Sequence, residues 1–282
     1  MIAAPASGAG DSVSARRVLV GLLLAIVGIG SVFWLPVFVV LCTAISLGCL
    51  WEFAQLSARK GPWLELPVAS AAIVAYVVLT YLGLSHRYER MLLAATVVLA
   101  LVTTLFSSTE GAFARSGYTL LAVLYIGKLT TYFVAIRLLP NGTAATVMAI
   151  LLIALTDIFA MLIGTRFGRT PLSPISPRKT VEGSAGGLLV AILAGVALGL
   201  SPWLHLQWWQ GGLIGAITSV AAQAGDLVES MLKRDANVKD AGSLIGGHGG
   251  VFDRFDSYIF GGIAFYFALY ITGVIPRGIS GL

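Results

Sequence analysis

The chain is a succession of long apolar runs separated by short polar segments that contain charge, proline, glycine or asparagine. A membrane-spanning helix needs about 20 mostly apolar residues. The pattern predicts an all-α, polytopic membrane protein with about nine transmembrane helices, and the weakest boundary is Leu35–Pro36, where a proline would equally fit a kink within one long helix. We expect spans near residues 18–33, 36–54, 66–84, 91–107, 117–139, 143–165, 184–205, 209–229 and 257–275.

The composition agrees with this pattern and excludes an ordinary soluble domain. Hydrophobic residues make up 57% of the chain and charged residues 11%, and the mean hydropathy is +0.91. These values lie far outside those of soluble domains. With 282 residues and nine spans, no independent extramembrane domain of ordinary size fits, so we expect a single membrane-embedded domain over residues 1–282.

The distribution of Lys and Arg predicts which side each loop faces. If the N-terminus is cytoplasmic, thirteen of these residues fall on the inner side and four on the outer side, with Lys128 left inside a span. This bias follows the positive-inside rule and predicts a cytoplasmic N-terminus and a non-cytoplasmic C-terminus. The net charge of +5 is therefore assigned to topology and not to a nucleic-acid partner, since no basic block exceeds two residues.

Two inner segments are far more polar than the others. Residues 157–182 and 226–256 hold sixteen of the 31 charged residues in 57 of the 282 positions. Both face the cytoplasm in the predicted topology. We therefore expect the active site to be formed by loops on the cytoplasmic side.

The first polar segment contains an acidic residue within a span and a phosphate-binding candidate. Asp157 lies about 13 Å inside the span end at Arg166, where a carboxylate costs about 2.5–3.5 kcal/mol. It is interpreted as a site or pathway residue, the alternative being a structural pair with a cation such as Lys128. The run from Ser176 to Thr180 supplies two hydroxyls and two cations before a helix start, a setting that favours phosphate, although an ordinary cationic loop would look similar.

The second polar segment is denser. If the eighth span continues as a helix, Asp226, Ser230 and Lys233 share one face, the alternative being a solvated helix end. The glycines around His248 would let the backbone approach an anion, or would form an ordinary turn beside a structural histidine. The tract is followed directly by Asp253, Arg254 and Asp256.

This mixture of residue types indicates a reaction class. Carboxylates without a Cys/His cluster favour Mg²⁺ over zinc, and Mg²⁺ with Lys and Arg serves phosphoryl or nucleotidyl transfer. The chain has no Walker A, G-x-S-x-G or H-E-x-x-H pattern that would indicate another chemistry.

From Ser230 to Asp256 the chain resembles the signature of the phosphatidate cytidylyltransferase (CDP-diacylglycerol synthase) family at every fixed position. The pattern is Ser230-x-Leu-Lys-Arg-x₄-Lys-Asp-x-Gly-x₂-Ile-Gly-x-His-Gly-Gly-Val-x-Asp-Arg-Phe-Asp256. Close resemblance covers about residues 156–257, whereas the first 140 residues agree only in hydropathy and in Trp51-Glu52-Phe53. Met161, Val181 and Gly246 replace a frequent tyrosine, tryptophan and proline, and none of these departures removes a charged group.

The resemblance implies CTP and phosphatidic acid as substrates, with CDP-diacylglycerol and pyrophosphate as products. It implies N-terminal spans over 18–140 and catalytic spans and loops over 141–282. Mg²⁺ would be held by Asp226 and Asp253, with Mn²⁺ as an alternative and a second cation left open. The implied catalytic residues are Lys233, Arg234, Lys239, Asp240, His248, Arg254 and Asp256. The implied substrate-binding residues are Asp157, Ser176, Lys179, Thr180, Ser230, Gly249 and Gly250.

Two other functions stay open at this stage. A related lipid CTP-transferase acting on another lipid acceptor would share the polar loop, and a transporter would also use polar residues within the membrane. We expect the bacterial cytoplasmic (inner) membrane as the location, with membrane lipids as further partners. A homodimer is left open.

Overall fold

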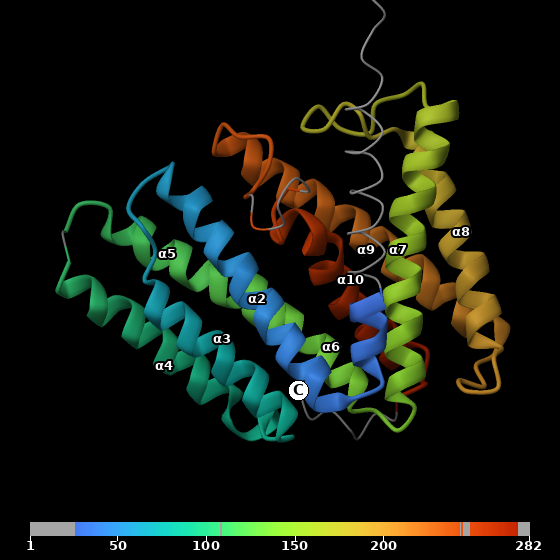
Figure 1. Cartoon of the computed structure of the whole chain (residues 1–282), viewed down its shortest axis with the longest axis horizontal. Helices are drawn as coiled ribbons and strands as arrows, with labels where there is room; N and C mark the ends of the chain where they lie inside the picture. The colour runs from blue at the N-terminus through green and yellow to red at the C-terminus, as the bar shows by residue number, and fades with distance from the viewer. Residues whose placement is uncertain (1–25, 108, 243, 245–248, 276–282) are drawn as a thin grey trace, which may run out of the picture.

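The computed structural model describes residues 26–107, 109–242, 244 and 249–275, and within these ranges the chain is helical without a strand. Figure 1 shows the helices gathered into one bundle. Its described helices are α2 (Leu35–Ala58), α3 (Leu66–Tyr81), α4 (Ser85–Leu105), α5 (Ala112–Ala122), the π-helix η1 (Val123–Lys128), α6 (Leu129–Arg137), α7 (Gly142–Phe167), α8 (Val181–Gly199), α9 (Trp208–Asp235) and α10 (Phe252–Ile271).

The helices coincide with the predicted apolar runs. Six of them are long and apolar enough to cross a membrane: α2, α4, the continuous run Ala112–Arg137, α7, α8 and α9. Helix α3 is apolar but shorter, and α10, whose first turns carry charged residues, is not among the six. The structure therefore supports an integral membrane protein made of helices, while the count of nine spans stays a prediction.

The break predicted at Leu35–Pro36 is real. Residues 26–32 are helical, Phe33 and Trp34 leave the helix, and α2 begins at Leu35. Pro36 lies in the first turn of α2 and Pro67 in the first turn of α3. Proline is tolerated there because the first N–H groups of a helix have no intrahelical acceptor.

The C-terminal helices pack in chain order, α7 against α8, α8 against α9, and α9 against α10. In Figure 1 α7 and α8 lie side by side. Helices α8 and α9 cross at glycines: a Cβ on Gly195 would overlap the Gly211 carbonyl oxygen, and a Cβ on Gly211 would overlap that of Gly195. Small residues permit such close helix contacts in membranes, where lipid supplies no hydrophobic driving force between helices.

Two apolar clusters hold the two halves of the bundle, and α10 contributes to both. One cluster includes Leu152 of α7 and Phe265 of α10. The other includes Phe53 of α2, Ile126 of η1 and Phe252, the first residue of α10. Because Phe252 lies in the second cluster, the start of α10 is anchored against the N-terminal helices.

Candidate active site

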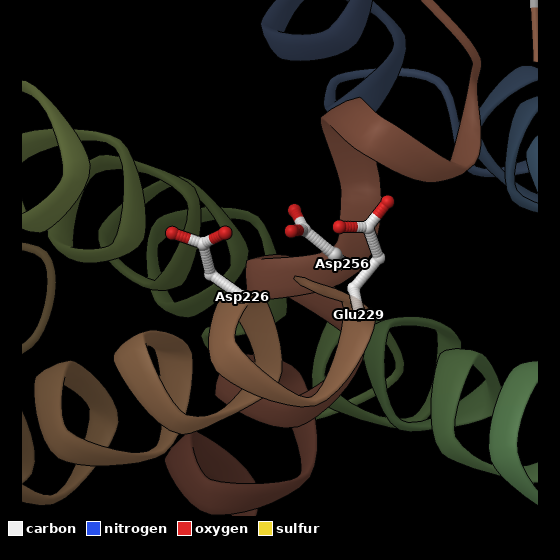
Figure 2. A group of neighbouring side chains, drawn as sticks. All are labelled: Asp226, Glu229 and Asp256. Carbon is white, nitrogen blue, oxygen red and sulfur yellow. The ribbon is translucent and has the colours of Figure 1, made fainter. Parts of the chain in front are cut away.

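Three carboxylates from two neighbouring helices meet at the centre of the candidate site. Figure 2 shows Asp226 and Glu229 extending from α9 and Asp256 from α10. One oxygen of each lies within 4.8 Å of the others. Glu229 is fully buried and Asp256 is 6% exposed. We call Asp226, Glu229 and Asp256 the carboxylate cluster.

Two lysines flank the carboxylate cluster. Lys179 Nζ lies 2.6 Å from Asp226 Oδ2. Lys233 Nζ lies 2.6 Å from Glu229 Oε2 and 2.6 Å from Asp253 Oδ1. Helix α9 continues past the predicted span end at residue 229 and runs to Asp235, which is the condition under which Asp226, Ser230 and Lys233 share one face. This continuation carries Lys233 to the cluster.

The loop between α7 and α8 is folded so that Lys179 reaches Asp226. The Leu172 N–H donates to the Lys179 carbonyl at 2.7 Å, and the Val181 N–H donates to the Thr170 carbonyl at 2.9 Å. Glu182 accepts hydrogen bonds from the Arg169 and Thr170 N–H groups at 3.1 and 3.2 Å. These bonds close the loop on itself and bring its only lysine toward α9.

The two hydroxyl-bearing residues predicted beside Lys179, Ser176 and Thr180, make local contacts, Thr180 through its hydroxyl and Ser176 through its backbone carbonyl. Thr180 is the N-cap of α8 and accepts from the Gly183 N–H at 3.2 Å, a common stabilising arrangement at a helix start. The Ser176 carbonyl accepts from the Lys179 N–H at 3.0 Å. Both residues therefore shape the loop that carries Lys179.

Asp253 organises the segment before α10. Its carboxylate accepts from the Ala241 N–H at 3.0 Å and the Gly250 N–H at 2.8 Å, and it pairs with Lys233. Of the two metal ligands implied by resemblance, Asp226 is thus in the carboxylate cluster and Asp253 lies beside it, engaged by the lysine and two amides.

Asp157 belongs to the same site. It lies on α7 within reach of the Ser257 hydroxyl, Asp226 and Lys179. The alternative of a pair with Lys128 does not hold, because Lys128 Nζ lies 2.7 Å from Glu89 Oε2. Three helices, α7, α9 and α10, therefore contribute carboxylates to one region.

The other predicted residues surround this centre. Ser230 is buried on α9 at 8% exposure. Gly249 adopts a positive φ of 79° and precedes Gly250, whose N–H donates to Asp253. His248 lies outside the described residues. Four of the predicted catalytic residues are exposed to solvent, where a substrate from water could meet them: Arg234, Lys239, Asp240 and Arg254.

Two acidic residues were not among the predicted site residues. Glu229 could have been identified from its spacing, since it lies one turn before Lys233 in the polar segment. Glu52 lies in α2, in the Trp51-Glu52-Phe53 run where the N-terminal half resembles the family, and it is fully buried beside the segment that precedes α10.

The chemistry of the carboxylate cluster fits a hard divalent cation. All its donors are carboxylate oxygens, the ligands that Mg²⁺ prefers. Among the described residues, both Glu229 oxygens are buried without a hydrogen-bond donor, although Lys233 lies within ion-pair distance of one. Three acids so close together, two of them buried, repel one another, and a cation would relieve that repulsion.

The chain is similar to a known protein family and to several named relatives. Residues 15–272 match the sequence model of the cytidylyltransferase family. A protein from Synechocystis named phosphatidate cytidylyltransferase is 34% identical over 90% of this chain and 97% of its own length. A protein of that name from Bacillus subtilis is 36% identical over 90% of this chain and 97% of its own. A chloroplastic relative from Arabidopsis thaliana is 45% identical over 47% of this chain and 33% of its own.

Proposed function

The chain belongs to the cytidylyltransferase family, and from that premise we propose that it transfers a cytidylyl group from CTP to phosphatidic acid, giving CDP-diacylglycerol and pyrophosphate. The observation that carries the proposal is the carboxylate cluster flanked by Lys179 and Lys233. Carboxylates and lysines around one point are what a reaction between two phosphate groups requires.

The depth of the site suits substrates from two phases. Asp226 lies three residues before the end of the predicted span 209–229, which is about 4.5 Å at 1.5 Å per residue. Such a position lies near the boundary between headgroups and hydrocarbon. The phosphate of phosphatidic acid would enter from the bilayer, and CTP would enter from water past exposed Arg234, Lys239 and Arg254.

In the proposed reaction an oxygen of the phosphatidic acid phosphate attacks the α-phosphorus of CTP. The bond between the α-phosphorus and the bridging oxygen to the β-phosphate breaks, and pyrophosphate leaves with the electron pair. A phosphate monoester has a second pKa of about 6, so the nucleophile is largely ionised at neutral pH. No general base is required, and the protein's task is to align two anions and neutralise their charge.

The residues divide this task. Asp226, Glu229 and Asp256 would hold Mg²⁺, which when bound supplies charge neutralisation at the phosphate oxygens. Lys179 and Lys233 lie on either side of the cluster and can turn from their carboxylates to phosphate oxygens. Asp253 holds Lys233 and the segment before α10 in place.

The proposal includes a topology. We propose nine spans with a cytoplasmic N-terminus in the bacterial inner membrane, supported by the agreement between the helices and the predicted apolar runs. The carboxylate cluster would then open toward the cytoplasm, the compartment that contains CTP.

The test is an assay of the purified protein in mixed micelles with labelled CTP and phosphatidic acid, the products being separated by thin-layer chromatography. We expect a labelled lipid that co-migrates with CDP-diacylglycerol, and equimolar pyrophosphate. Parallel reactions contain diacylglycerol without phosphate or a polyprenyl phosphate. A labelled product with one of these acceptors and none with phosphatidic acid would contradict the proposal.

A further inference from the structure

Glu52 is a buried acid in the N-terminal half of the chain, outside the two polar segments 157–182 and 226–256. It lies on α2 with no exposed surface. Burying a carboxylate is costly unless hydrogen bonds compensate. Its hydrogen bonds therefore indicate what it is for.

The carboxylate of Glu52 binds the segment that leads into α10, 192 to 200 residues away in the chain. Its Oε2 accepts from the Phe252 N–H at 2.8 Å, and Leu244 N lies 3.5 Å from Oε1. Phe252 is the first residue of α10, and no side chain at its own N-cap, Val251, caps that helix. A carboxylate from α2 thus accepts a free N–H at the start of α10, where negative charge is favoured.

Two glycines of the same segment are packed against Glu52. A Cβ on Gly242 would overlap Glu52 Oε1, and a Cβ on Gly250 would overlap Oε2. Neither glycine has a positive φ, so the backbone conformation does not require them. Glycine is needed at both positions because the Glu52 carboxylate occupies the space that a Cβ would fill.

The same segment is held from its other side by Asp253. Gly250 donates to Asp253 Oδ2 while its Cα faces Glu52, and Asp253 in turn binds Lys233. Phe252, held by Glu52, immediately precedes Asp253 and lies one helical turn before Asp256. A shift of the segment would therefore move Asp253, Lys233 and one member of the carboxylate cluster together.

We propose that Glu52 is a positioning residue that holds Gly242, Leu244, Gly250 and the start of α10 so that Asp253, Lys233 and Asp256 are in register with α9. The inference rests on the proposed cytidylyltransferase activity for its kinetic readout. Glu52 acts through the segment and not on the substrates, so it should affect turnover more than lipid binding. Displacement of reacting groups by about 1 Å can cost roughly a hundredfold in rate.

The first experiment compares Glu52→Ala and Glu52→Gln with Ser46→Ala. Ser46 is a matched control because it is a fully buried polar residue of α2, bonded to Thr130 at 2.8 Å. We expect kcat to fall about a hundredfold in Glu52→Ala and about tenfold in Glu52→Gln, whose NH₂ group would face an N–H. The KM for phosphatidic acid should stay within about twofold of wild type in both. Ser46→Ala should lower Tm without lowering kcat.

The second experiment is a double-mutant cycle between Glu52→Ala and Gly242→Ala. Gly242→Ala alone should lower kcat because its Cβ displaces the carboxylate. In the Glu52→Ala background that overlap is gone, so Gly242→Ala should cause no further loss. Additive losses would overturn the proposal, as would a Glu52→Gln protein that retains wild-type kcat.

Hydrogen–deuterium exchange supplies a readout that does not depend on turnover. Amides of residues 241–252 should exchange faster in Glu52→Gln than in wild type, while those of residues 212–223 in α9 should not change. If the wild-type protein makes no CDP-diacylglycerol, the proposed function fails while this exchange difference still tests Glu52. Unchanged exchange in 241–252 would overturn the positioning role even in an active enzyme.

Discussion

At the level of single residues, the carboxylate cluster that would bind a cation for activity also lowers the stability of the fold when no cation is bound. Asp226, Glu229 and Asp256 lie within 4.8 Å of one another, and without a cation their charges repel. A site built to bind an ion is commonly less stable than the same site with one charge removed. Activity and stability should therefore respond in opposite directions when one carboxylate is neutralised.

Asp256→Asn tests this opposition. The change preserves size but removes one charge, so we expect turnover to fall at least about a hundredfold, or 2.7 kcal/mol at 1.36 kcal/mol per decade. Without divalent cation the Tm should equal or exceed that of wild type. Mg²⁺ should raise the Tm of wild type by mass action and raise that of the variant much less.

Asp235→Asn is the control for this prediction. Asp235 is also on α9 but lies at the surface, 3.1 Å from Lys60, with 63% of its side chain exposed. Exposed ion pairs contribute about 0–1 kcal/mol, so its activity and Mg²⁺ response should match wild type. Activity is measured by the chromatographic assay and the Mg²⁺ response by thermal unfolding. Equal losses in the two variants would contradict the assignment of a cation to the carboxylate cluster.

At the level of elements, the register of α9 depends on its close crossing with α8. Gly211 and Gly195 approach so closely that a Cβ on either would meet the other's carbonyl oxygen. Asp226 is about four turns further along α9. The crossing therefore helps to set where the carboxylates stand relative to α7 and the Lys179 loop.

Gly211→Ala and Gly212→Ala form a matched pair on this crossing. Gly211→Ala places a methyl group against backbone, and we expect a loss of about 1–3 kcal/mol in stability. A Cβ on Gly212 would lie 3.3 Å from Val196 Cγ2, a side chain that can adjust. With the better helix propensity of Ala, Gly212→Ala should be neutral or stabilising. Tryptophan fluorescence during thermal unfolding in detergent would measure both, and equal effects would contradict the backbone contact.

At the scale of the whole molecule, contacts join segments that the positive-inside rule placed on one side. Lys60, after α2, pairs with Asp235 at the end of α9, and Arg115 lies 3.9 Å from Glu65. All four residues belong to predicted cytoplasmic segments. The fold is thus consistent with the relative sidedness of these loops.

Reporter fusions test the absolute orientation. A fusion after Leu282 should report the non-cytoplasmic side, and an insertion near Arg59 should report the cytoplasm, because thirteen of eighteen Lys and Arg residues lie on the predicted inner side. Alkaline phosphatase and green fluorescent protein activities in cells would distinguish the sides. Both reporters on one side would mean that an even number of spans lies between Arg59 and Leu282, and not the predicted seven.

By itself the sequence determined the membrane class and the positions of the helices, and it predicted the polar segments from which the candidate site is formed. Hydropathy is a local property, because each stretch of about 20 residues is judged against the bilayer and not against the rest of the chain. The break before Pro36 and the extension of α9 through Lys233 were also readable, since proline and i, i+4 spacing act within one helix. The polar segments 157–182 and 226–256 identified the face on which the site lies.

The tertiary structure alone decided how the charged residues combine. Spacing could not show that Glu229 and Asp256 join Asp226 while Asp253 pairs with Lys233 and two amides, because these choices depend on how α9 and α10 pack. Nor could it show that Lys128 pairs with Glu89. Glu52 is the clearest case: its partners lie 192 and 200 residues away, and only the packing of α2 against the start of α10 brings them together.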